Sequence, residues 1–343
     1  MNKLSSKTET HRAETYPHID LLKFLCALLV LMSHASPFSA LGETANIYIV
    51  NLSFRFAVPF FFISGGFFLF SDPFLTWKKL LRYLQRILIL YFFWTVIYRL
   101  FHLPYTFSKD ALFRFVFSGS TDVFWYFPSL IFSTALTYVL VKKTPLPVAF
   151  CIAIALYVLG LSANSYWGLL RTIPLFSEPM KAYNMVFEEA KRGVLFPTIF
   201  ILFGVAIAKY KERCTWTGIR LPLLVLFCYV LFALEFRLIT ERRWNWGRDM
   251  TVMIIPVSVG LFLLVARKTE TVPRPAFLWL RKMSTVVYCS HALVIEGVQR
   301  LLQAEQNQGN APLFFGLTLV LTLLISAVVV WLAKWIKPLR LLY

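Results

Sequence analysis

The sequence predicts an all-α fold, a polytopic integral membrane helical bundle of about ten transmembrane helices with both termini in the cytoplasm. Three observations support this prediction. Hydrophobic residues make up 58% of the chain, and the mean hydropathy is +0.66. Apolar runs of about 20 residues recur along the whole sequence, and Lys and Arg gather between alternate runs. A soluble domain of 343 residues would not show repeated runs of this length.

The hydropathy pattern divides the chain into a short tail and one long domain. Residues 1–15 are polar and of mixed charge, so we expect a disordered cytoplasmic tail without a cleavable signal peptide. Residues 16–343 form a single transmembrane domain, with neither a linker nor an internal repeat. The predicted spans are 19–41, 52–71, 84–103, 123–141, 146–163, 193–209, 219–239, 250–266, 284–302 and 311–335.

The distribution of basic residues predicts the orientation. The segments on the side of the termini carry most of the Lys and Arg, whereas the opposite segments 42–51 and 303–310 carry none. This bias favours an N-in, C-in topology. The net charge of +18 would suggest a nucleic-acid partner in a soluble protein, but here it follows from basic cytoplasmic loops. We therefore expect a lipid bilayer and no nucleic acid as partner, and a multi-pass location in a membrane.

The cysteines give no indication of a metal site. They are scattered through the chain without metal-ligand spacing, and most lie within apolar runs. We interpret them as reduced packing residues. The five positions are Cys26, Cys151, Cys214, Cys228 and Cys289.

The first predicted span contains ionisable groups that lipid would disfavour. Asp20 and Lys23 stand near its start and His34 well inside it. Such groups usually face a protein interior or a water-filled cavity. Lys23 and His34 are eleven residues apart, which places them on one helix face, roughly 16 Å apart along the axis. A cation and an imidazole at two depths are typical of a site that extends across part of the membrane.

The second predicted span adds a charge and a run of small residues. Arg55 lies near its start, at a depth similar to that of His34 if the two spans pack antiparallel. Arg55 could stabilise an oxyanion, orient an acceptor or pair with an acid, or it could reach the membrane interface. Ser64, followed by Gly65 and Gly66, could be a nucleophile, but close packing of helices is the favoured interpretation.

Several motifs resemble the acyltransferase-3 family of bacterial integral-membrane acyltransferases. The sequence IDLLKFLCALLVLMSH resembles the family's opening helix, and RFAVPFFFISGGFF its second helix. KKLLRYLQR, FWYFPSL and MSTVVYCSHALVIE are similar to later motifs. The chain departs from the family pattern in three ways. Lys23 replaces the commoner Arg, the late motif reads Tyr-Cys-Ser-His, and we expect a stand-alone form without a fused extracytoplasmic domain.

The resemblance implies acyl transfer across a membrane. The donor would be cytoplasmic acyl-CoA, most often acetyl-CoA, acting as a substrate with no bound cofactor. The acceptor would be a hydroxyl group of an extracytoplasmic glycan or lipid-linked sugar. Coenzyme A is polyanionic, and the basic segment after the second span could bind its phosphates. The sequence does not predict the oligomeric state.

The candidate site combines the resemblance with the chemistry of the side chains. His34 is the candidate general base, because imidazole titrates near neutrality and can accept a proton from a hydroxyl. Its alternative is a structural, hydrogen-bonded histidine. The predicted catalytic residues are His34, Lys23, Asp20 and Arg55. The predicted substrate-binding residues are Arg82, Arg86, Ser64, Trp125, Tyr288 and His291.

Two of these groups have a structural alternative. Arg82 and Arg86 could bind phosphate or serve only as topology determinants. Tyr288 and His291 share one helix face, so they could line the cavity or bond between helices. For the whole protein, the main rival function is transport of a small molecule such as an amino acid. The absence of repeated halves speaks against a transporter. A non-catalytic membrane sensor is a third possibility without positive support.

Overall fold

The protein is an all-helical bundle in the computed structural model, which describes residues 16–104, 108–211, 218–266, 275–302 and 311–343. The predicted all-α class is confirmed for these residues. The helices are α1 (Pro17–Ala35), α2 (Glu43–Phe54), α3 (Ala57–Phe70), α4 (Trp77–Phe101), α5 (Lys109–Phe117), α6 (Tyr126–Lys143), α7 (Leu146–Ser162), α8 (Trp167–Leu170), α9 (Pro174–Phe187), α10 (Pro197–Tyr210), α11 (Arg220–Glu241), α12 (Ile254–Val265), α13 (Pro275–Leu302) and α14 (Ala311–Leu332), with the 3-10 helices η1 (Ser39–Leu41) and η2 (Lys337–Leu342). The predicted tail 1–15 lies outside the described residues.

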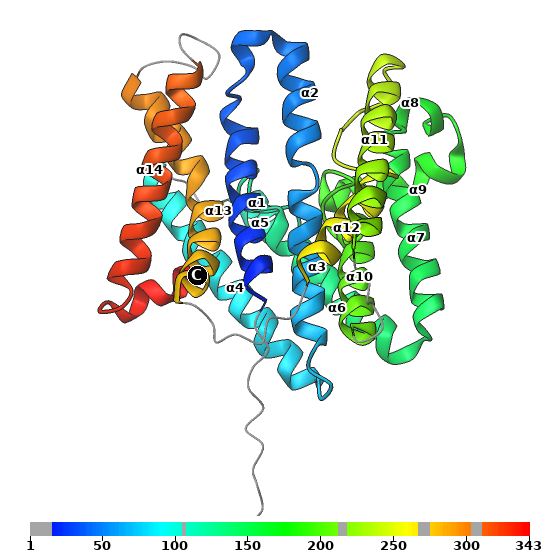
Figure 1. Ribbon diagram of the computed structural model, residues 1–343, viewed down its shortest axis with the longest axis horizontal. Coiled ribbons are helices and arrows are strands. Elements are labelled where there is room, and N and C mark those ends of the chain that lie inside the picture. The colour runs from blue at the N-terminus through cyan, green and yellow to red at the C-terminus, as the bar shows by residue number, and fades with distance from the viewer. Residues whose placement is uncertain (1–15, 105–107, 212–217, 267–274, 303–310) are drawn as a thin grey trace, which may run out of the picture.

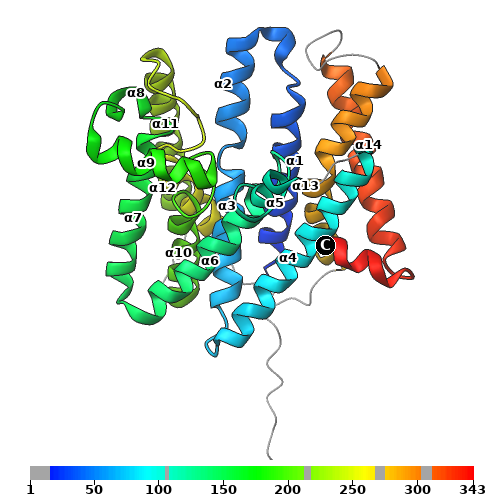
Figure 2. The same ribbon diagram turned by 180° about the vertical axis from the view of Figure 1, so that it is seen from behind.

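The long helices run side by side, and α4 crosses behind them at an incline (Figures 1 and 2). Helices α1 to α3 stand in the centre, α13 and α14 on one side, and α7, α10 and α11 on the other. Helix α1 begins at the lower end in Figure 1, and η2 ends near that level. We call this end the lower face and the opposite end the upper face.

Five helical stretches are long and apolar enough to cross a membrane. They are Pro17–Ala35, Glu43–Phe70, Trp77–Phe101, Arg220–Glu241 and Ala311–Leu332. Three shorter apolar helices are Leu146–Ser162, Pro197–Tyr210 and Ile254–Val265. The structure therefore agrees with a multi-pass membrane protein, while the count of about ten spans and the N-in, C-in orientation stay predictions.

Several helical stretches begin earlier than hydropathy predicts, among them α4 at Trp77 instead of 84, and two others show the reason. The second span was expected at 52–71, but α2 starts at Glu43 and meets α3 at a break around Arg55. The ninth was expected at 284–302, but α13 starts at Pro275. In both cases the added turns contain polar or charged residues. Such residues hide a helical extension from a hydropathy window because they lower its mean.

Helices α10 and α12 are too short to cross a bilayer alone. They contain 14 and 12 residues, or roughly 21 and 18 Å of helix, against a hydrocarbon core of about 30 Å. Irregular segments, 188–196 and 242–253, precede them. Irregular backbone within a membrane protein needs hydrogen-bond partners from the protein. The Asn164 Oδ1 atom accepts from the backbone N–H groups of Asp249 (3.1 Å) and Met250 (3.0 Å).

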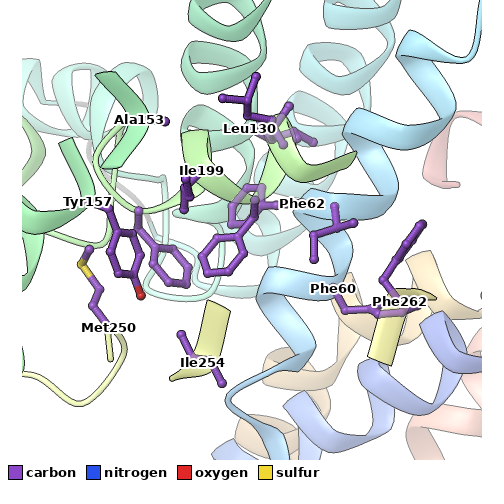
Figure 3. Packing of buried hydrophobic residues seen from close by; sticks show 14 of the residues in the cluster. Phe60, Phe62, Leu130, Ala153, Tyr157, Ile199, Met250, Ile254 and Phe262 are labelled. Atoms are coloured by element: carbon purple, nitrogen blue, oxygen red, sulfur yellow. The ribbon is translucent and has the colours of Figure 1, made fainter. Parts of the chain in front are cut away.

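An aromatic core fixes the short helices against α3. Phe60, Phe62 and Phe262 are fully buried, and Figure 3 shows them with Tyr157 and Met250 around the start of α12. Helices α3 and α10 approach closely, because a methyl group built on Gly66 would overlap the carbonyl oxygen of Ile201. This contact agrees with the packing interpretation of the Gly-Gly pair. Among the cysteines, Cys26 and Cys289 are buried, and Cys214 lies outside the described residues.

Candidate active site

The start of α1 is tied to α13 by an ion pair. Asp20 is buried and accepts two hydrogen bonds from Arg281, each of 2.8 Å. One helical turn further on, the backbone carbonyl of Lys23 accepts a hydrogen bond of 3.0 Å from the Ser284 hydroxyl. Asp20 therefore has a structural partner, while the Lys23 side chain is left to line a neighbouring cavity.

That cavity has several basic side chains in its walls, and we call it the basic pocket. It has a volume of about 660 Å³ and lies between α1, α4, α6, α13 and η2. Five of its described lining residues are basic and none is acidic. The basic residues are Lys23, Arg86, Arg281, Lys282 and Arg340. Aromatic side chains of Phe61, Tyr126 and Tyr288 complete its walls.

The structure separates the two arginines that the sequence groups together. Arg86 lines the basic pocket. Arg82, one turn earlier on α4, is exposed, is not among the residues that line the pocket, and donates weakly to the Lys78 carbonyl at 3.4 Å. The two side chains thus occupy different environments, although both belong to the same basic segment.

His34 lies against a second histidine. The ring centroids of His34 and His291 are 5.2 Å apart. His291 is fully buried, and its Nδ1 atom bonds to the Tyr288 carbonyl at 2.6 Å. A carbonyl oxygen accepts, so Nδ1 carries the proton and Nε2 is an acceptor. This Nε2 atom has no hydrogen-bond partner among the described residues. His34 is exposed to the surrounding space.

Tyr288 links the histidine pair to the basic pocket. Its ring centroid lies 6.0 Å from that of His291, and it also lines the pocket. Its hydroxyl donates to the Val123 carbonyl at 2.6 Å, which ties α13 to the segment before α6. Lys23, Arg86 and Tyr288 therefore line one pocket, and Tyr288 connects it through His291 to His34.

On the side of the irregular segments, charged side chains form a connected group that we call the ion network. Arg55, at the break between α2 and α3, pairs with Asp249 and donates to Asn51 at 2.7 Å. Lys191 bonds to Asp249 at 3.3 Å and to Glu189 at 3.0 Å. The network continues through Arg192, Glu188, Asp122 and Arg114.

Opposite charges stabilise each other within the network. Burial alone would raise the pKa of Asp249, but Lys191 and Arg55 outweigh burial and hold that pKa below its usual range. Burial would likewise lower the pKa of Lys191, but Asp249 and Glu189 outweigh it and raise that pKa. Both side chains are only 19% exposed, so near neutral pH the group holds ionised partners in a largely desolvated place.

The network reaches the histidine pair electrostatically. The charged groups that act on His34 are Lys191, Arg55, Asp249 and Asp122. Trp125 is half-buried beside them, with the Lys191 ammonium 5.7 Å from its ring centroid. The structure therefore brings Arg55 and Trp125 near the same charged group, as it brings Tyr288 and His291 near His34.

Ser64 lies apart from these groups. Its side chain is 1% exposed, its hydroxyl has no hydrogen-bond partner among the described residues, and it does not line the basic pocket. Its place in the tightly packed α3 gives it no contact with the cavity that Arg86 and Tyr288 line.

Sequence reasoning did not single out the acids and the lysine of the network. Asp249, Glu189 and Lys191 lie in segments that hydropathy assigns to outer loops. The available signal was an acid or a base directly before a short apolar run. That signal identifies a buried charge only once the loops are known to fold inward.

Comparison with known proteins identifies the family. Residues 16–331 match the acyltransferase-3 family, Acyl_transf_3, described as an acyltransferase domain. An amino-acid racemase of Enterococcus faecalis is 29% identical over 74% of this chain and 36% of that protein. A second amino-acid racemase of E. faecalis is 25% identical over 92% of this chain and 46% of that protein.

A serine/alanine racemase of Enterococcus gallinarum is 26% identical over 89% of this chain and 44% of that protein. The chain thus spans less than half the length of these curated relatives. No solved structure matches it. Because the family match covers nearly the whole chain, with apolar helices of membrane-spanning length, this chain belongs to the acyltransferase-3 family.

Proposed function

We propose that this protein moves an acyl group, most simply acetyl, from cytoplasmic acyl-CoA to a hydroxyl of an extracytoplasmic glycan or lipid-linked sugar. The observation that carries the proposal is the position of His34. It lies next to His291 and Tyr288, which lead to the basic pocket, and within electrostatic reach of the ion network. A base that lies near both the basic pocket and the ion network could act on one substrate bound in each.

The basic pocket supports a polyanionic donor. Arg281 is paired with Asp20, whereas the other four cations of the pocket have no carboxylate partner among the described residues. Phosphate oxygens suit such groups through charge-assisted hydrogen bonds. The helical rise from Lys23 to His34 is roughly 16 Å, a distance that an extended phosphopantetheine arm can cover. The thioester would then reach the histidine pair while the nucleotide stays in the pocket.

The ion network supports a neutral acceptor. Its cations Arg55, Lys191, Arg192 and Arg114 are matched by Asp249, Glu189, Glu188 and Asp122. A balanced group leaves no net charge to attract an anion but offers many hydrogen-bonding atoms. The Trp125 ring can pack against a sugar face. These features are what a carbohydrate hydroxyl requires.

In the proposed reaction, His34 takes the proton of the acceptor hydroxyl as its oxygen attacks the thioester carbonyl carbon. The carbon–sulfur bond breaks, an ester forms, and the departing thiolate takes up a proton to leave as free CoA. Arg55 can stabilise the developing oxyanion through the guanidinium nitrogen that its two partners leave available. Direct attack needs no acyl-enzyme, so Ser64 has no covalent role.

A thioester assay tests the proposal. Purified protein in lipid nanodiscs receives acetyl-CoA with and without a soluble sugar acceptor, and free thiol is measured. We expect acceptor-dependent release of CoA that is lost in His34→Gln. Intact acetyl-CoA in the presence of a panel of sugars would contradict the proposal.

The same assay separates the rival function. The names of the relatives concern amino acids and belong to proteins more than twice as long as their matched part. An amino-acid transporter would leave the thioester intact and would accumulate labelled amino acid in proteoliposomes. Location in a bacterial cytoplasmic membrane with N-in, C-in topology belongs to the proposal. Labelling from outside of a cysteine placed at Lys142 would contradict that orientation.

A further inference from the structure

The last seven residues fold back onto the bundle instead of leaving it. They comprise η2 (Lys337–Leu342) and Tyr343, and they follow residue 331, where the family match ends. The indole N–H of Trp94 on α4 donates to the Leu342 carbonyl at 3.1 Å. Leu342 is buried, and Tyr343 packs against the same apolar cluster. The segment is therefore anchored to α4.

This anchoring brings three side chains of the segment to the wall of the basic pocket: Arg340, Leu341 and Tyr343. Tyr343 is linked to α13, because the Lys282 ammonium lies 4.9 Å from its ring centroid. The Arg340 guanidinium donates to the carbonyls of Ala333 (3.0 Å) and Lys334 (3.2 Å) through Nε and Nη2. These bonds hold the side chain in place and leave Nη1 available for a ligand.

The charges around the pocket call for an anion. Arg340 brings a further cation towards Lys23, Arg86 and Lys282, and none of the four has a carboxylate partner among the described residues. Mutual repulsion of such groups is relieved when they share a polyanion. The planar guanidinium is well suited to phosphate because it can donate two parallel hydrogen bonds.

We infer that the C-terminal segment is a wall of the donor site, and that Arg340 binds a phosphate at the nucleotide end of acyl-CoA. This inference rests on the proposed function and adds to it a binding residue that lies outside the family-matched region. The pocket's aromatic side, with Phe61, Tyr126 and Tyr288, faces the histidine pair. The exposed Arg340 lies on another wall, where the polar end of the donor would remain.

Calorimetric titration of the purified protein with CoA and with 3′-dephospho-CoA tests the inference. Arg340→Gln should weaken CoA binding about 10- to 100-fold, the range for loss of one charge-assisted phosphate contact. Lys337→Gln is the matched control. Lys337 is a basic, exposed residue of the same segment that does not line the pocket, so its loss should change affinity less than about twofold.

Two further variants guard against loss of fold. Lys282→Gln removes a pocket cation on α13 and should also weaken CoA, while Arg340→Lys keeps the charge and should fall between wild type and Arg340→Gln. Thermal unfolding and gel filtration verify each variant. If wild type binds CoA but folded Arg340→Gln binds equally well, the inference is wrong and the proposed function stands. If wild type binds no CoA, the proposed donor itself is wrong.

Discussion

The basic pocket and the ion network differ in how their charges are balanced. In the pocket, four cations face a cavity without a carboxylate partner among the described residues. In the network, each cation has an acidic partner, and the Arg55–Asp249–Lys191 group is largely buried. The cations of the pocket can therefore bind an anionic ligand, whereas the cations of the network are neutralised by acidic side chains of the protein. Similar residue types therefore serve binding in one region and positioning in the other.

The largest expected effect comes from His34, which lies near both regions. His34→Gln keeps some hydrogen bonding but removes the base, so turnover should fall by about 10²–10⁴-fold. The CoA dissociation constant should stay unchanged, because the pocket cations lie elsewhere. Turnover and CoA binding are measured on the same purified variant. Near-normal turnover would exclude His34 from catalysis. The basic pocket and the ion network would then not be joined by a catalytic residue.

His291 tests how the centre is organised. A protonated His34 donates from both ring nitrogens, and the unpartnered Nε2 atom of His291 is an acceptor beside it. Loss of a hydrogen bond to a charged group is worth about 1.5–3 kcal/mol, so His291→Phe should slow turnover roughly 10- to 100-fold. His291→Gln restores an acceptor and should recover part of the rate.

A double-mutant cycle separates this role from a structural one. If His291 acts through His34, the double variant His34→Gln/His291→Phe should be no slower than His34→Gln alone. If the fold-losses in turnover of the two single variants instead multiply in the double variant, His291 has a separate role in the packing of α13.

Asp249→Asn tests whether the network is structural. The change leaves Arg55 and Lys191 without their shared carboxylate, so the free energy of unfolding should fall by about 1–3 kcal/mol. Because the pKa of Asp249 is depressed in the folded protein, its contribution is fully present above the unfolded-state value of about 3.9. It is lost as the pH falls through the lower folded-state pKa.

Thermal unfolding between pH 3 and 8 measures this difference. The stability gap between wild type and Asp249→Asn should be constant above about pH 5 and should narrow below about pH 4. Glu241→Gln is the control, since Glu241 forms an exposed pair with Arg237 and should matter by less than about 0.5 kcal/mol. A gap that widens in acid would show that the carboxylate does not stabilise the network.

The sequence predicts the parts of this picture that depend on local composition. Recurrent apolar runs predict the helical bundle, and the spacing of Lys23 and His34 predicts a path along one face of α1. The sequence does not reveal that 188–196 and 242–253 fold inward, because their polar residues look like outer loops until their partners are known. Asp249 and Lys191 are recognisable as site residues only after Arg55 is found beside them.

Contacts between distant parts of the chain also decide which basic residues line the pocket. Arg340 lies far from Arg86 and Lys23 in sequence, and its segment reaches the pocket because Leu342 and Tyr343 pack against α4 and Leu342 accepts a hydrogen bond from Trp94. Arg82 and Arg86 look equivalent in the motif KKLLRYLQR, because they are four residues apart and therefore lie on nearly the same face of one helix. The position of α4 relative to α13 decides which of them faces the cavity.

Single substitutions of these two arginines sharpen the comparison. Arg86→Gln should weaken CoA binding by about 1–2 kcal/mol, because it removes a pocket cation. Arg82→Gln should cost less than about 0.5 kcal/mol, because that side chain is exposed outside the pocket. Calorimetric titration with CoA provides both values. Equal losses would mean that phosphate is bound by the exposed face of α4 and not within the pocket.

The smallest expected effect is at Ser64, which belongs to neither region. A nucleophile must meet the thioester, yet the Ser64 hydroxyl is buried in α3 and does not line the basic pocket. Because this hydroxyl has no hydrogen-bond partner among the described residues, Ser64→Ala removes an unsatisfied polar group and should keep or slightly raise stability. Turnover should stay within about twofold of wild type.

Rapid quench with labelled acetyl-CoA should leave no label on the wild-type chain. Label recovered on a peptide that contains Ser64 would replace direct transfer by a two-step mechanism and would require the donor's acyl end to enter α3.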